Sequence, residues 1–125
     1  MMNAKHARGL LDRIEVLRHP SDVDLLIFFA RHPRALMANE QLAALLGYGI
    51  KQIAESLDVL LQAGFLRRIP NRAHAARMYV FVANGPNEGL LPPLVELACT
   101  REGRLAIRRA LKRRPGSGKE VETDG

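Results

Sequence analysis

The apolar and polar positions between residues 50 and 66 alternate with the period of an α-helix. Four apolar side chains lie at i, i+4, i+7 and i+8, which is the spacing of one buried stripe. Four polar side chains form a second stripe, which is left for solvent or a partner. Gly64 follows this segment and favours the left-handed conformation that ends many helices. The apolar stripe is Ile53, Leu57, Leu60 and Leu61, and the polar stripe is Lys51, Glu55, Asp58 and Gln62.

The chain before this segment carries further helical patterns. The first runs from residue 4 to 18 and ends before Pro20, because a proline disfavours the helical conformation in the residue that precedes it. The second, at residues 22–31, is apolar on most sides and should lie at the centre of the domain. The remaining patterns predict a short extended piece at 36–37, a helix at 39–46, a turn at Gly47-Tyr48-Gly49 and a helix at 50–62.

After Gly64 the pattern changes from helical to extended. Residues 65–69 and 78–82 favour strands, and the loop between them starts with a Pro-Asn pair, so they predict a β-hairpin. The connecting sequence P-N-R-A-H-A-A-R makes the tip of this hairpin basic. Two more helices are expected within residues 92–113, after prolines that suit a first helical turn. Residues 114–125 have no periodicity, which predicts a disordered tail.

Together these elements predict a mainly α domain at residues 1–113 with a small β-hairpin. The run L-A-A-L-L-G at 42–47 and the run I-A-E-S-L-D-V-L-L-Q-A-G-F-L at 53–66, separated by five residues of turn and cap, resemble the helix-turn-helix of ArsR-type and MarR-type bacterial regulators. The hairpin follows at once, which is the order of a winged helix-turn-helix. The resemblance covers about residues 21–83, and the helices at 4–18 and 92–113 flank it.

This resemblance implies a transcriptional regulator that binds double-stranded DNA. The helix at about 50–62 would enter the major groove, and the wing at about 67–82 would contact the backbone or the minor groove. Guanidinium groups pair with phosphates, and the amide of Gln52 suits adenine. The candidate DNA-binding residues are Lys51, Gln52, Glu55, Ser56, Arg67, Arg68, Arg72, His74 and Arg77.

The expected recognition helix departs from the family pattern in its charge. Glu55 and Asp58 outnumber Lys51, so its exposed face is net acidic, which is unfavourable in a groove lined by phosphates. Ile50 also places an apolar side chain where a polar one is usual in these families. The alternative function is therefore a winged-helix protein-protein interaction module without DNA binding, in which Ile50 and the two carboxylates contact a protein.

The overall charge favours a polyanionic partner. The 125 residues include 19 Lys and Arg against 13 Asp and Glu, which gives a formal net charge of +6. Residues 49–83 contain five basic and two acidic residues, and residues 84–113 contain six and three. No run approaches the ~18 apolar residues that a membrane span needs, and no secretory signal opens the sequence. The chain is therefore expected in the cytoplasm.

Other chemistry is sparse in the sequence. Cys99 is the single cysteine, so the metal-binding cysteine pair of ArsR-type sensors is absent, and its apolar surroundings predict a small core residue. The histidines include no pair at i, i+3 or i, i+4, so no metal site is expected. No nucleophile arrangement or glycine-rich phosphate loop occurs, so neither enzyme activity nor a cofactor is expected. An enzyme or a small-molecule sensor would need a deep pocket between the flanking helices.

The flanking helices carry apolar stripes that lie outside the winged unit. In the resembling families such helices form a two-fold homodimer, which places two recognition helices about one DNA turn apart. The sequence therefore predicts a homodimer through residues 4–18 and 92–113. The alternative is that these helices fold back on their own subunit.

Overall fold

In the part of the chain that the structure describes, six α-helices and a small three-stranded sheet make up the fold. The structure, a computed structural model, describes residues 2–70, 77–83, 85 and 88–112. The helices are α1 (Met2–Asp12), α2 (Pro20–Arg31), α3 (Asn39–Leu46), α4 (Ile50–Gln62), α5 (Leu91–Leu97) and α6 (Arg101–Lys112), with a short 3-10 helix, η1, at Glu88–Leu90. The strands are β1 (Met37–Ala38), β2 (Leu66–Pro70) and β3 (Arg77–Phe81).

The sheet is antiparallel, with the order β1-β3-β2. The β2–β3 pairing confirms the predicted hairpin, and its register sets Leu66 opposite Phe81 and Pro70 opposite Arg77. The short extended piece predicted at 36–37 is β1, one residue further along, and it adds a third strand through the pairing of Met37 with Tyr79. The prediction of a mainly α fold with a hairpin is therefore confirmed, and the sheet has one strand more than expected.

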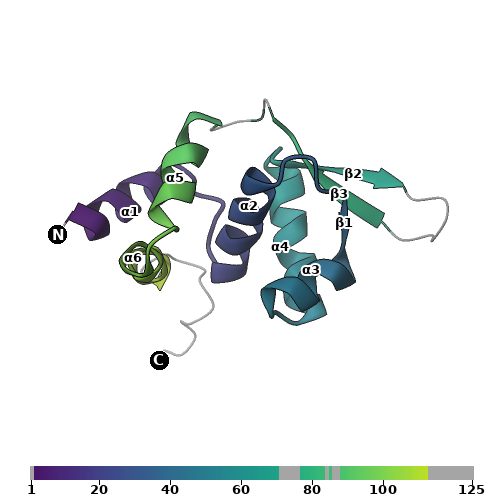
Figure 1. Cartoon of the computed structure of the whole chain (residues 1–125), viewed down its shortest axis with the longest axis horizontal. Coiled ribbons are helices and arrows are strands. Elements are labelled where there is room, and N and C mark those ends of the chain that lie inside the picture. Colours follow the sequence, from purple (N-terminus) through teal and green to yellow (C-terminus); the bar gives the residue numbers. More distant parts are fainter. Residues whose placement is uncertain (1, 71–76, 84, 86–87, 113–125) are drawn as a thin grey trace.

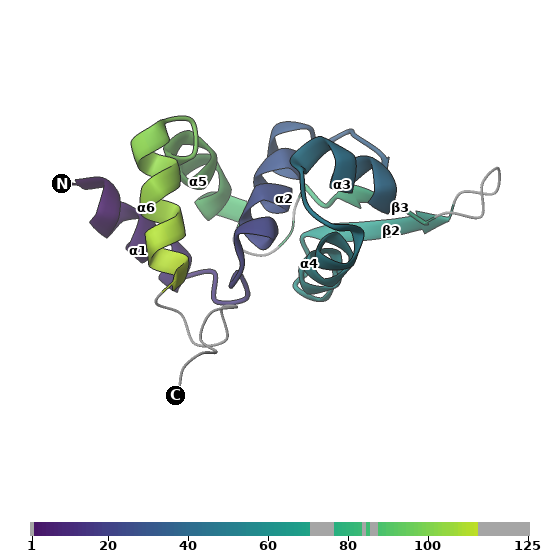
Figure 2. The same cartoon turned by 90° about the horizontal axis from the view of Figure 1, so that it is seen from below.

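Helix α2 lies at the centre of the molecule (Figure 1). Figures 1 and 2 show α1, α5 and α6 on one side of it, and α3, α4 and the sheet on the other. This position agrees with its sequence, since α2 is apolar on most sides and buries residues towards both halves. Its fully buried side chains are Leu25, Leu26 and Phe29, and the core extends from them into both halves. The central position predicted for residues 22–31 is confirmed.

The flanking helices bury their apolar stripes inside the same chain. Helix α1 packs along α6 and also contacts α5, which in turn contacts α2. Helix α1 is shorter than the predicted 4–18, since it ends at Asp12 and tight turns follow. Ile14 and Leu17 belong to these turns, and their side chains are still buried in the core. The apolar residues thus keep a helical spacing beyond the end of the helix.

A glycine follows each of the helices α3 and α4, at the turn and at the helix end that the sequence predicts. Gly47 ends α3 with φ at 80°, and Gly64 follows α4 with φ at 87°, both in the left-handed region that a side chain makes costly. The backbone N–H of Phe65 donates to the carbonyl of Leu60 at 3.0 Å, which closes the end of α4 and starts the extended segment. The predicted bounds of α3 and α4 match the structure.

The turn between α5 and α6 corrects the expectation for Cys99. Helix α5 ends at Leu97, so Cys99 lies in the turn after it and is exposed instead of being a core residue. The hydroxyl of Thr100 caps α6 by accepting from the N–H of Gly103 at 2.9 Å. A Cβ on Gly103 would lie 1.7 Å from the carbonyl oxygen of Leu97, so only glycine permits this close approach.

Tyr48 ties the α3–α4 turn to the central helix. Its hydroxyl donates to the Oδ2 of Asp24 on α2 at 2.6 Å. Burial, then this hydrogen bond and the negative charge of Asp24, raise the pKa of Tyr48 to about 12, although the charge of Arg108 and a hydrogen bond with it lower that pKa in part. The phenol is therefore held in its protonated form, because only that form can donate to the carboxylate.

The raised pKa of Tyr48 predicts a loss of stability at high pH. The unfolded phenol ionises near its ordinary pKa of about 10, whereas the folded phenol ionises near 12. The contribution of the protonated Tyr48 phenol to the stability of the fold is thus complete below the unfolded pKa, and it is lost as the pH rises towards the folded pKa. A spectrophotometric titration should show a tyrosinate step near pH 12 that Tyr48→Phe removes and that Asp24→Asn moves to lower pH. A Tyr48 step at the ordinary pH would contradict the arrangement.

Candidate functional site

The polar stripe of α4 is exposed along the helix. Lys51, Glu55, Asp58 and Gln62 are all exposed, as their spacing predicts. The stripe carries one cation and two carboxylates, so its net charge is negative. The first turn of α4 differs from its middle, because Gly49 supplies no side-chain cap and the free backbone N–H groups add partial positive charge there. Lys51 lies in that first turn.

A buried polar cluster joins α4 to the start of α2. We define the Asp22 cluster as Asp22, Ser21, Ser56 and Gln52. Ser21, Asp22 and Ser56 are each 1% exposed. The Oδ2 of Asp22 accepts from the backbone N–H groups of Arg18 and His19, both at 3.0 Å, which holds the chain before α2 against its first turn. One oxygen of the carboxylate is therefore satisfied by the backbone that precedes α2.

The hydrogen bonds of the Asp22 cluster run in one direction. Ser56 donates to the Oδ1 of Asp22 at 2.5 Å. The hydroxyl of Ser56 has one proton, and it donates this proton to Asp22. At the 2.6 Å contact between Ser21 and Ser56, the donor is therefore Ser21. Ser21 in turn accepts from the Nε2 of Gln52 at 2.8 Å. Every bond in the chain Gln52 to Ser21 to Ser56 to Asp22 thus points towards the buried carboxylate.

This cluster changes the role expected for two candidate DNA-binding residues. Ser56 is buried and both donates and accepts inside the protein, so it is not on the surface of α4 and does not face a base. The expectation of a base contact from Ser56 is corrected for this reason. Gln52 is partly buried and spends one N–H of its amide on Ser21, which leaves its second N–H and its carbonyl oxygen for other partners.

The hairpin supplies the cations nearest to α4 in sequence. Arg67 and Arg68 are exposed on β2, which contacts α4 and follows it directly. Arg67 pairs with Val80 and Arg68 with Tyr79 in the backbone register. Arg77 belongs to β3 by its backbone. Arg72 and His74 lie outside the described residues, so the basic hairpin tip stays a prediction from the sequence.

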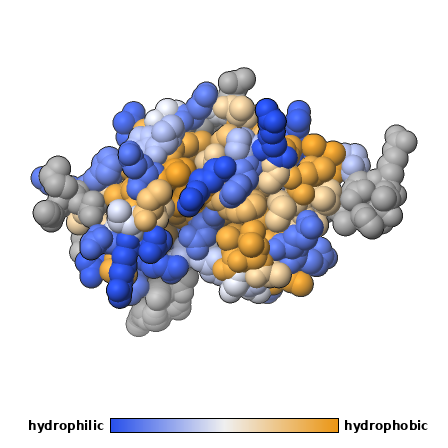
Figure 3. Space-filling view, viewed as in Figure 1, coloured by the Kyte–Doolittle hydropathy of each residue, from blue (hydrophilic) through white to orange (hydrophobic). Residues whose placement is uncertain are grey.

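Two exposed apolar side chains lie beside the α3–α4 turn, and only one of them was singled out from the sequence. Leu45, near the end of α3, is 56% exposed, and Ile50, at the start of α4, is 54% exposed. Figure 3 shows hydrophobic surface gathered over the half of the molecule that contains α3, and hydrophilic surface over the part that contains α6. Leu45 belongs to the L-A-A-L-L-G run, where the helical spacing from the buried Leu42 already marks it as off the core face.

A cleft of about 290 Å³ lies between α2 and α6, with Leu46 of α3 on its wall. Its rim includes Arg104 and Arg108. Arg104 already donates to the carbonyl of Ala98 at 3.0 Å, and Arg108 lies near enough to Tyr48 to lower the pKa of its phenol. Two of the cations that line the cleft therefore already interact within the protein, and the exposed Arg31 lines it as well. Among the described residues, no group of three or more His, Cys, Asp or Glu side chains is placed to hold a metal ion.

Comparisons with known proteins add no assignment. No protein-family model matches the sequence, and neither the curated proteins nor the solved structures contain a match to it. Within the described part of the chain, no helix has the length and apolar character needed to cross a membrane.

Removing the hydroxyl of Ser56 should destabilise the fold. Ser56→Ala leaves Oδ1 of the buried Asp22 without its donor and leaves the Ser21 hydroxyl without its acceptor, so we expect a loss of about 1–3 kcal/mol in the free energy of unfolding. Urea unfolding measures this loss. The control is Asp58→Asn, an exposed position on the same helix, which should change stability by no more than about 0.5 kcal/mol. Equal stability of the two variants would contradict the cluster.

Proposed function

We propose that this chain is a DNA-binding transcriptional regulator of the winged helix-turn-helix type. In this proposal α3 and α4 are the helix-turn-helix, α4 is the recognition helix and β2–β3 is the wing. The order α2, β1, α3, α4, β2, β3 and the sheet order β1-β3-β2 support it. The observation that carries it is the exposed polar stripe of α4 next to a strand with two exposed arginines, Arg67 and Arg68.

The contacts divide between phosphates and bases. Arg67, Arg68 and Lys51 provide charge for phosphates, and the uncapped start of α4 adds backbone N–H groups that favour an anion. For bases, α4 presents Glu55, which can accept from cytosine, and the remaining amide atoms of Gln52. Affinity would then depend mainly on the arginines, since the stripe itself is net acidic.

The homodimer stays a prediction, but the flanking helices no longer offer unpartnered apolar stripes to support it. The apolar stripes of α1, α5 and α6 are used inside the chain, as the alternative of folding back on the same subunit requires. Val16 and Leu105 are the large apolar side chains of the flanking part that are still exposed among the described residues. Sedimentation velocity at micromolar concentration would determine the oligomeric state.

A protein-interaction module is the second candidate, and Leu45 and Ile50 favour it. Two exposed apolar side chains at one turn, next to carboxylates of the same helix, suit a protein surface better than a phosphate-lined groove. The two functions predict different responses of DNA affinity to a change in the charge of α4.

Neutralising the hairpin arginines should lower the salt dependence of DNA binding. We expect anisotropy titrations of a labelled random-sequence duplex to show salt-sensitive binding, with a slope of log affinity against log salt that is less negative by about 1.8 in Arg67→Gln/Arg68→Gln, because each phosphate contact contributes about 0.9. Absence of salt-sensitive binding by the unaltered protein would refute the proposed function.

Neutralising the carboxylates of α4 separates the two candidates. On a random-sequence duplex the cytosine contact of Glu55 contributes little on average, so the main effect of Glu55→Gln/Asp58→Asn is to remove repulsion between α4 and phosphates. DNA affinity should therefore rise by severalfold, given about 1 kcal/mol or less for each exposed charge. If α4 instead binds a protein through these carboxylates, DNA affinity should not change. The same titration measures both outcomes, and the unfolding free energy serves as the control for folding.

A further inference from the structure

Helix α6 carries more positive charge than any other helix of the chain. Its twelve residues include five basic side chains and one acidic side chain. The apolar positions Ala106, Ile107 and Leu111 are buried against the rest of the domain, so the charged side chains share the outer face. This charge was not part of the candidate DNA-binding residues, and the proposed function does not use it.

The basic side chains of α6 differ in how far they are engaged. Arg104 donates to a backbone carbonyl, and Arg108 acts on Tyr48. Arg109 and Lys112, in the last turn, are exposed. Arg8 of α1, which packs along α6, is also exposed. We define the flank patch as Arg8, Arg109 and Lys112.

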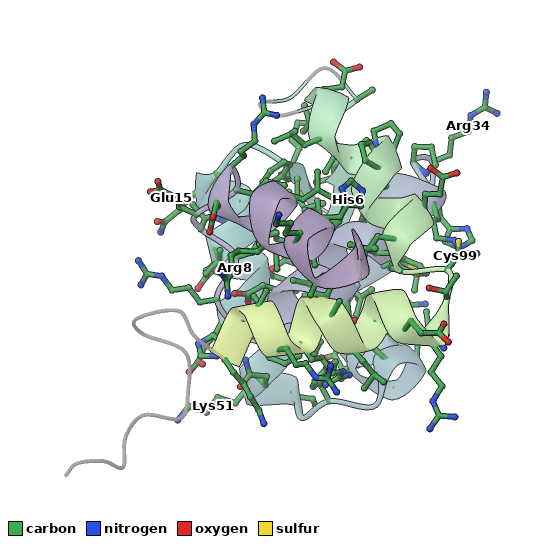
Figure 4. All side chains as sticks on the ribbon, turned by 90° about the vertical axis from the view of Figure 1, so that its left-hand side faces the viewer. His6, Arg8, Glu15, Arg34, Lys51 and Cys99 are labelled. Atoms are coloured by element: carbon green, nitrogen blue, oxygen red, sulfur yellow. The ribbon has the colours of Figure 1, made fainter. Side chains whose placement is uncertain are left out.

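The flank patch lies on the same side of the molecule as the start of the recognition helix. Figure 4 shows the labelled Arg8 and Lys51 on one side, at the end where α6 finishes, and Arg34 on the opposite side. Figure 2 shows the C-terminal end of α6 and helix α4 along one edge of the molecule, with the hairpin extending beyond α4. A straight rod laid along this edge would pass the end of α6, then α4, then the hairpin.

We propose that the flank patch binds phosphates of the same DNA duplex that α4 and the hairpin contact. This inference rests on the proposed function and extends its footprint to the side away from the hairpin. Duplex DNA fits because it is a long rod with regularly spaced negative charge, and it can span separate cationic groups along one edge. The net acidic stripe of α4 lies between the two cationic groups, so charge on both sides of it holds the duplex against that stripe.

Other charges on these elements bear on this surface. Asp12 of α1 and Glu15 after it are acidic and near the patch in sequence, and Figure 4 places Glu15 on the same side as Arg8. Basic residues at the end of a helix also interact favourably with its dipole. The dipole explains a contribution of Arg109 and Lys112 to stability, and it predicts no effect on DNA binding. Binding and stability must therefore be measured separately.

The test compares two double variants that remove the same charge from opposite sides. Arg109→Gln/Lys112→Gln removes two cations from the flank patch. The control, Arg34→Gln/Arg101→Gln, removes two exposed cations from the loop after α2 and from the first turn of α6. Each protein is titrated with a labelled random-sequence duplex of about 30 bp, roughly three helical turns, at several salt concentrations, and its unfolding free energy is measured.

We expect the slope of log affinity against log salt to become less negative by about 1.8 in the flank variant and to stay unchanged in the control, because each neutralised phosphate contributes about 0.9. Combined with Arg67→Gln/Arg68→Gln, the two shifts should add, since the sites are separate.

Three results would overturn the inference. Equal shifts in the flank variant and the control would show an effect of net charge alone. If the slope does not shift in the flank variant but does shift in Arg67→Gln/Arg68→Gln, the flank patch does not bind phosphates, and the proposed function still stands. No salt-sensitive binding by the unaltered protein would remove both.

Discussion

The hydrogen bonds of the buried Asp22 carboxylate fix the geometry on which the rest of the fold depends. A buried carboxylate is costly unless donors satisfy it, and here the donors come from the loop before α2 and from Ser56 on α4. Helix α4 can therefore pack on α2 in only one rotation that keeps Ser56 facing Asp22. Apolar packing alone permits small rotations, whereas a hydroxyl that must reach one oxygen does not.

This constraint also decides which side chains α4 can offer to a partner. Fixing Ser56 inward turns Gln52 to the boundary, where Ser21 takes part of its amide. The surface that is left is the stripe with Lys51 at one end and two carboxylates behind it. The same interaction that positions the helix thus reduces its hydrogen-bonding capacity and leaves its exposed charge negative. If the partner is a nucleic acid, its cationic contacts have to come from neighbouring elements, and the hairpin and α6 each contain several basic residues.

The sequence predicts elements well where one periodicity dominates, and poorly where a polar residue is buried. The bounds of α3 and α4 and the stop at Gly64 follow from spacing, because apolar stripes and left-handed glycines act locally. The position of Ser56 predicts its burial, although serine is usually read as a surface residue. It lies three positions after Ile53 and four before Leu60, so it sits on the edge of the buried stripe. Its partner Asp22 is 34 positions away, and no local pattern connects them. The exposure of Cys99 likewise depends on where α5 ends.

The flanking helices and the α3–α4 turn are linked through a single set of side chains. Tyr48 in the turn donates to Asp24 on α2, and Arg108 on α6 acts on the same phenol. Helix α6 therefore places a positive charge near the turn that precedes α4, although α6 lies on the far side of α2 from the sheet. A displacement of α6 would withdraw Arg108 from Tyr48 and change the charge that the turn experiences. Because Asp22 fixes the rotation of α4 and Tyr48 bonds Asp24 at its start, two carboxylates of α2, spaced two residues apart, position α4, one buried in the core and the other at the wall of the cleft.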